Sequence, residues 1–182
     1  MVYARGMKRL IAASCSLFIA AVLLAAVEGS AGGVRWVLPA RWQASGPRPM
    51  RMATYTIPAA PGSEAGECGV FYFGQGRGGS VEENLDRWVK QFESAGPPKR
   101  SEKTVNGLKV HRIDISGAYL TPGGPMMQSQ GKKPGWRLIG AIVEAPEGLV
   151  FFKAVGPAAT MQKAEKDFEE LVASLSRAGA KA

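Results

Sequence analysis

The sequence predicts an α+β domain with a mainly antiparallel sheet of about six or seven strands and two helices packed against it. Three observations support this class. Short apolar runs are bounded by Gly, Pro and Asn. Most neighbouring runs are joined by short turns, which favours antiparallel pairing. Two longer segments carry apolar residues at helical spacing. With 46% hydrophobic and 21% charged residues, the 182-residue chain has the composition of a globular protein.

The chain begins with a segment that has the layout of a secretory signal. Three basic residues, Arg5, Lys8 and Arg9, precede the apolar run Leu10–Val27. The small residues Gly29–Ala31 then supply a candidate cleavage site. We therefore expect a hydrophobic signal helix ahead of the fold.

On this basis we assign residues 1–31 to a signal peptide and residues 32–182 to a single α/β domain. Two alternatives stay open. Residues 10–27 could remain as a membrane anchor, or Cys15 could be acylated, as in a lipoprotein. All three interpretations place the domain outside the cytoplasm, in the periplasm or the extracellular space.

Three strands are expected first. Val34–Leu38 is short and apolar, Met50–Ile57 alternates in side-chain type until Pro58, and Cys68–Phe73 is apolar enough for a buried strand. The glycine-rich stretch Gly74–Gly79 ends the third strand.

The clearest helix starts at Ser80. Ser80 and Glu83 have the spacing of a capping box, in which each residue satisfies an amide of the other. One apolar stripe follows, and Gly96 with the two prolines after it ends the segment. The stripe consists of Val81, Leu85, Trp88, Val89 and Phe92.

Two β-hairpins and a second helix complete the predicted domain. Asn106-Gly107 favours a two-residue turn between Lys99–Val105 and Leu108–Tyr119. Trp136–Ala145 and Leu149–Val155 form the second hairpin.

Between the hairpins, residues 121–135 lack periodicity and are predicted as a long loop. The final helix is expected over residues 158–177. Its apolar stripe consists of Met161, Ala164, Phe168, Leu171, Val172 and Leu175. The two helices could share one face of the sheet or cover one face each.

This order of elements, over residues 34–177, resembles the Mog1/PsbP-like α/β/α sandwich. Locally, Asn84–Trp88, Lys133–Arg137 and Phe151–Pro157 are similar to segments of uncharacterised bacterial exported proteins. The resemblance implies a non-enzymatic accessory or binding role, and it supplies no catalytic residue and no cofactor.

Candidate catalytic and metal-binding residues are few. His111 is the only histidine and no Gly-x-Ser-x-Gly motif is present, which argues against a serine hydrolase. Cys68 could pair with His111 as a thiol catalyst. The alternative is that Cys68 is a small residue at a strand start and His111 an exposed strand residue. Soft ligands for copper are available in two methionine pairs, Met50/Met52 and Met126/Met127, whose alternative role is apolar packing.

Basic residues cluster in the first hairpin and around the long loop. The chain has a net charge of +8, which becomes +6 when the leader, with three basic residues and one acidic residue, is removed. If the two segments are adjacent, they form a positive face for an anion or partner; the alternative is an ordinary solubilising surface. Its members are Lys99, Arg100, Lys103, Lys109, His111, Arg112, Lys132, Lys133 and Arg137.

The partner expected for this face is an unknown envelope protein or an anionic membrane surface, not a nucleic acid, because this hairpin lacks stacking aromatics. We therefore predict an exported, non-enzymatic binding or accessory protein of the cell envelope without a cofactor. One alternative is a membrane-anchored scaffold of an envelope complex. Another is a small thiol- or metal-handling protein that uses Cys68, His111 or the methionines.

Overall fold

The computed structural model describes residues 28–93, 96–121 and 131–179. Its main feature is an eight-stranded sheet within these residues, in which every pairing is antiparallel. In spatial order the strands are β3 (Gln43–Ala44), β4 (Ala53–Ile57), β5 (Gly66–Tyr72), β10 (Gly148–Pro157), β9 (Lys132–Ala145), β8 (Leu108–Leu120) and β6 (Phe92–Glu93), and β7 (Lys99–Val105) also pairs with β8.

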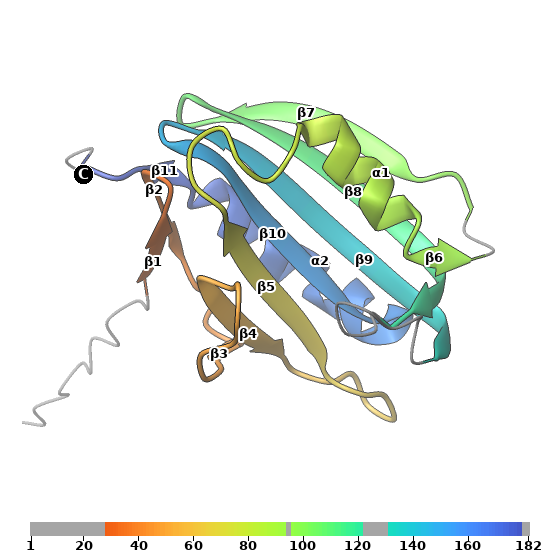
Figure 1. Cartoon of the computed structure of the whole chain (residues 1–182). Helices are drawn as coiled ribbons and strands as arrows, with labels where there is room; N and C mark the ends of the chain where they lie inside the picture. Colours follow the sequence, from red (N-terminus) through yellow and green to blue (C-terminus); the bar gives the residue numbers. More distant parts are fainter. Residues whose placement is uncertain (1–27, 94–95, 122–130, 180–182) are drawn as a thin grey trace, which may run out of the picture.

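One helix lies on each face of this sheet (Figure 1). α1 (Val81–Val89) packs on the side that faces the viewer, and α2 (Ala158–Ala173) lies behind. The α+β class and the mainly antiparallel sheet are therefore confirmed. No helix in the described part of the chain combines the length and apolar character needed to cross a membrane. The predicted signal helix lies outside the described residues.

The capping box predicted for α1 is present. The Glu83 amide donates to Ser80 Oγ at 3.2 Å, and the Ser80 amide donates to Glu83 Oε2 at 2.7 Å. The helix ends at Val89, earlier than the apolar stripe suggested, and Phe92 belongs to β6. α2 likewise ends at Ala173 and not at residue 177.

A second, three-stranded sheet lies at the end of the domain. It consists of β1 (Glu28–Ala31), β2 (Val34–Val37) and β11 (Ser176–Arg177), in the order β1-β2-β11. Residues 28–31, which the sequence assigned to the signal peptide, are thus paired with β2. Within the described residues, β1 is therefore part of the fold, while the predicted cleavage after Ala31 stays a prediction.

The predicted long loop is also shorter than expected. Residues 132–135 belong to β9, where Lys132 is paired with Leu120 and Lys133 with Tyr119 of β8. Residues 122–130, including Met126 and Met127, lie outside the described part.

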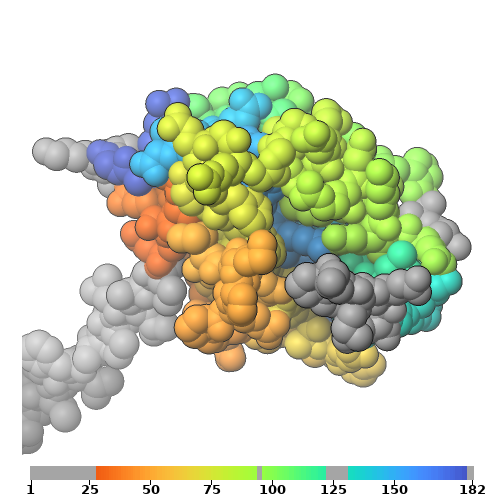
Figure 2. Space-filling view, in the orientation of Figure 1, coloured from red at the N-terminus to blue at the C-terminus, as the bar shows by residue number. Residues whose placement is uncertain are grey.

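The face that carries α1 is only partly covered. Leu85 and Trp88 of α1 pack against Ile113 and Ile142, on β8 and β9. The neighbouring β4, β5 and the middle of β10 lie beside the helix and not beneath it (Figure 1). We call this part of the face the open half. Figure 2 shows the blue atoms of β10 at the bottom of a depression between the segments coloured orange to yellow and the helix.

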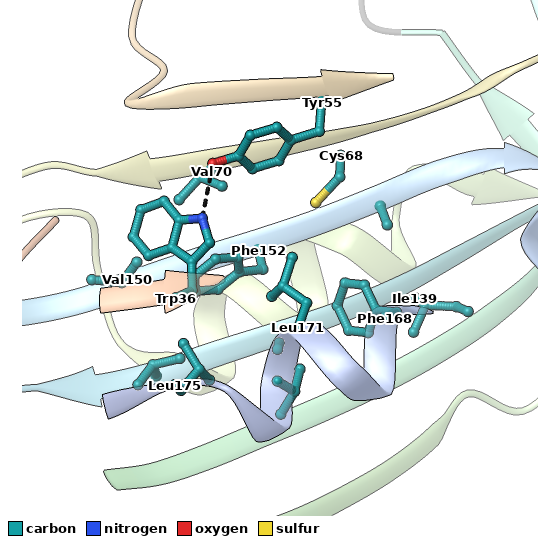
Figure 3. Packing of buried hydrophobic residues seen from close by; sticks show 14 of the residues in the cluster. Trp36, Tyr55, Cys68, Val70, Ile139, Val150, Phe152, Phe168, Leu171 and Leu175 are labelled. Carbon is teal, nitrogen blue, oxygen red and sulfur yellow. Dashed lines mark hydrogen bonds between the residues drawn. The ribbon is translucent and has the colours of Figure 1, made fainter. Parts of the chain in front are cut away.

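The opposite face is closed by α2 and β2 around a large apolar core (Figure 3). Phe168 and Leu171 of α2 have no exposed surface. Trp36 of β2 packs edge-on against Phe152, with ring centroids 5.1 Å apart, and donates from Nε1 to the Tyr55 hydroxyl at 2.8 Å. This core contains most of the large buried side chains, so it sets the stability of the domain.

Candidate functional site

The predicted basic cluster is divided between the two faces of the sheet. Because side chains alternate along a strand, neighbouring basic residues point to opposite sides. Lys103 and Arg112 reach Glu169 of α2, at 3.0 and 2.6 Å. Arg100, next to Lys99 in β7, instead reaches Glu82 and Asp86 of α1.

Most members of the cluster are paired with carboxylates. Arg137 binds both oxygens of Asp114, at 2.8 and 2.7 Å, and contacts Glu165 of α2. These two carboxylates raise the pKa of Arg137 above its usual value, against the effect of its burial. The remaining pairs are Lys109 with Glu102 and Glu144, Lys132 with Glu93, and Lys133 with Glu64. The nine residues therefore do not form one face of unpaired positive charge, and their role in partner binding stays a prediction.

Lys99 differs from its neighbours because no carboxylate in the described part lies within 4 Å of its amine. It lines two adjoining pockets between the sheet and α2, with volumes of about 280 and 440 Å³. Asp114, Arg137 and Glu165 line both pockets as well. These three residues bind one another, whereas Lys99 has no carboxylate partner in the described part of the chain.

His111 is not the exposed strand residue that the sequence suggested. Only 6% of it is exposed. Its Nε2 lies 2.7 Å from Glu144 Oε1 and its Nδ1 lies 3.0 Å from Glu102 Oε1. The imidazole thus links β7 to β9 across β8.

The thiol pair considered from the sequence does not form. Cys68 faces the α2 side and has no exposed surface, whereas His111 faces the α1 side with two strands between them in the sheet. Burial, together with the carboxylate of Glu67, raises the pKa of the Cys68 thiol well above its usual range, which opposes formation of the thiolate.

The described residues also contain no group of three or more His, Cys, Asp or Glu side chains placed to hold a metal ion. Met50 and Met52 are 77% and 53% exposed.

The sequence missed the group of side chains in the open half of the sheet. Lys153 lies in the middle of the apolar strand β10 and points to the α1 side. Its partners in the neighbouring strands are both glycines, Gly69 on β5 and Gly140 on β9. Because neither glycine has a side chain, side chains from other positions lie on both sides of the lysine. We call the surroundings of the Lys153 side chain, on the α1 side of β10, the Lys153 hollow.

Aromatic and polar groups surround the Lys153 amine. Its Nζ lies 2.5 Å from Gln91 Oε1, 3.5 Å from the Tyr119 hydroxyl and 5.6 Å from the centre of the Tyr119 ring. The Phe71 ring occupies the space above Gly69, within 2.9 Å of where a Cβ atom would lie. The hollow therefore combines a cation with aromatic rings.

The charges around the hollow do not balance. Glu67 accepts from Arg51 at 2.6 Å and from Arg48 at 3.0 Å, so its carboxylate already has two partners. Among the described residues, no carboxylate lies within 4 Å of the Lys153 amine. Burial, together with the charge of Arg51, lowers the pKa of Lys153 to about 8.

One feature of the sequence could have pointed to this group of side chains. It is the presence of a lysine inside the apolar run Leu149–Val155.

The architecture defines a class of fold. An antiparallel sheet with one helix on each face and this order of elements is the Mog1/PsbP-like sandwich, and the predicted resemblance is confirmed at the level of the fold.

Two solved structures with this architecture are similar to the chain. The solution structure of cyanobacterial PsbP (CyanoP) from Synechocystis sp. PCC 6803 has a TM-score of 0.53 and 10% sequence identity, and the match covers 91% of this chain and 98% of that one. Protein PA94 of Pseudomonas aeruginosa, whose function is unknown, has a TM-score of 0.49 and 12% identity, over 82% of this chain and 94% of that one. No family model and no curated protein matches the sequence. At these identities the likeness concerns the fold alone.

Proposed function

We propose that the protein is an exported, non-enzymatic binding or accessory protein of the cell envelope, and that it binds through the open half of its sheet. The observation that carries the proposal is the unequal covering of the two faces. α2 and β2 close one face over a continuous apolar core, whereas α1 lies over β8 and β9 on the other, where the apolar cluster beneath it extends to Phe151 of β10. Beside α1, this face combines charged side chains such as Glu67 and Lys153 with the partly buried ring of Phe71, a mixture that suits a recognition surface.

Export is supported by the leader-like sequence alone. The basic residues before Leu10–Val27 and the small residues after it have the order of a signal segment. The proposed location in the cell envelope and the proposed binding surface on the open half are separate parts of the hypothesis, so they need separate measurements.

Site-specific photo-crosslinking in living bacterial cells tests the binding surface. A photoreactive residue replaces Thr56, which is exposed in β4 beside the open half, or Lys166, which is exposed on the outer face of α2 and serves as the matched control. We expect a discrete adduct in the envelope fraction from position 56 and none from position 166. The proposal fails if neither position gives an adduct, if both positions give the same adduct, or if the protein stays in the cytosol.

A membrane-anchored scaffold is the second candidate, and the position of β1 favours it. β1 begins at Glu28, directly after the apolar run Leu10–Val27. Cleavage after Ala31 would therefore remove a paired strand, whereas a retained anchor would leave it intact. The mass of the N-terminal peptide of the native protein distinguishes the two candidates.

A further inference from the structure

The Lys153 hollow has an excess of positive charge. Lys153, Arg48 and Arg51 face a single carboxylate, that of Glu67, within the described part of the chain. Both arginines bind this carboxylate, so it is not available to neutralise the lysine. A charged group that is taken out of water without a counter-ion is destabilised, and a ligand that supplies the counter-ion gains that energy on binding.

The hydrogen-bonding groups at the hollow match an anion as well. The Lys153 ammonium has three donors, of which Gln91 Oε1 accepts one at 2.5 Å and the Tyr119 hydroxyl oxygen accepts a second at 3.5 Å, which leaves one for a ligand. The Tyr119 hydroxyl can donate its own proton at the same place. A carboxylate has two oxygens and can accept from both groups.

Aromatic rings flank these donors on two sides. Phe71 lies on the β5 side of Lys153, above Gly69. Tyr119 lies on the β8 side, stacked on Trp136 with ring centroids 5.5 Å apart and planes 4° from parallel. Rings in this position favour a flat apolar body next to the anionic group.

We propose that the Lys153 hollow binds a small organic carboxylate with a flat apolar body, held by Lys153 and the Tyr119 hydroxyl. This inference rests on the proposed function, because it assigns a ligand class to the open half of the sheet.

Equilibrium dialysis of the full-length protein with 2-naphthoate tests this proposal. The neutral analogue 2-naphthalenemethanol has the same ring system without the carboxylate. We expect naphthoate to bind at least tenfold more tightly than the alcohol, and Lys153→Met to remove this difference. Lys166→Met, which changes an exposed lysine on the other side of the molecule, should bind naphthoate like the wild type.

The pH dependence provides a second measurement on the unaltered protein. A bound carboxylate favours the charged amine, so the affinity for naphthoate should fall as the pH rises through about 8, while that of Lys153→Met stays constant. Equal binding of acid and alcohol, or naphthoate binding unchanged by Lys153→Met, overturns the proposal. The crosslink at position 56 is independent of naphthoate. A crosslink without naphthoate binding would refute only this ligand assignment, and naphthoate binding without the crosslink would refute only the proposed envelope partner.

Discussion

Gly140 allows α1 to pack closely against the sheet because it has no side chain, and Gly140→Ala tests this directly. A Cβ atom at this position would lie 2.8 Å from Trp88 Cε3, still closer to Cζ3, and 3.0 Å from Ile113 Cγ2. Carbon atoms in contact prefer about 3.5–4.0 Å, so the indole would have to move by about 1 Å. Trp88 is only 6% exposed and lies between α1 and the sheet.

The expected cost follows from overpacking of a filled core. An added methyl group without room typically destabilises by about 1–3 kcal/mol. Complete displacement of the indole sets an upper limit of about 3–5 kcal/mol, the usual cost of deleting a large aromatic side chain. Urea unfolding followed by circular dichroism measures the change. Gly46→Ala is the matched control, because nothing lies within 4 Å of its added Cβ. It should stay within about 0.5 kcal/mol of the wild type.

A double-mutant cycle with Trp88→Leu identifies the cause. With the indole removed, Gly140→Ala should cost less than about 1 kcal/mol, since the closest atoms that the new methyl group meets are gone and only Ile113 Cγ2 at 3.0 Å remains. The reasoning is refuted if Gly140→Ala unfolds at the same urea concentration as the wild type. It is also refuted if the cost is the same with and without Trp88.

Four further results are expected. Asp167→Ala should lower the free energy of unfolding by about 1–3 kcal/mol in urea, because Trp42 Nε1, which donates to Asp167 at 3.1 Å, is left buried without an acceptor. Recovery of the lost stability on adding Trp42→Phe would identify this cause. Lys153→Met should be more stable than the wild type at pH 7, because the folded protein binds its lysine proton less tightly than the unfolded chain. The difference in the free energy of unfolding should shrink as the pH rises from about 8 towards 10.5, and a constant difference would contradict this. Cys68 should react with a thiol reagent only after unfolding, and rapid reaction of the native protein would show that it opens locally. A chain that starts at residue 32 should unfold at lower urea than one that starts at Glu28, because it lacks β1, and equal midpoints would show that β1 contributes nothing.

Local chemistry allowed much of the fold to be predicted. The Asn106-Gly107 turn has the expected positive φ angles, 48° and 77°, and the Ser80 capping box forms as the spacing indicated. The strands β1 and β11 could not be found in this way, because each is short and gains its pairing from β2, far away in the sequence in the case of β11. Short strands contain too few residues for a periodicity to show.

The candidate site was less accessible to sequence analysis, for the same physical reason. A lysine in an apolar strand is visible in the sequence, but the register that places it between Gly69 and Gly140 is a long-range property. The division of the basic cluster is also set by pairing, since Arg100 and Arg112 reach carboxylates on different helices.

A high local density of basic residues is therefore a poor guide to where this protein can bind an anion. Arg112 and Arg137 come from the richest basic segments, and each already has a carboxylate at 2.6–2.7 Å. An incoming anion would have to compete with these partners for the two arginines. Lys153 lies outside the cluster, in a strand of apolar residues, and no carboxylate in the described part of the chain pairs with its amine. An anion gains free energy where a charge is unmatched, and the unmatched charge of Lys153 supports the binding surface proposed for the open half of the sheet.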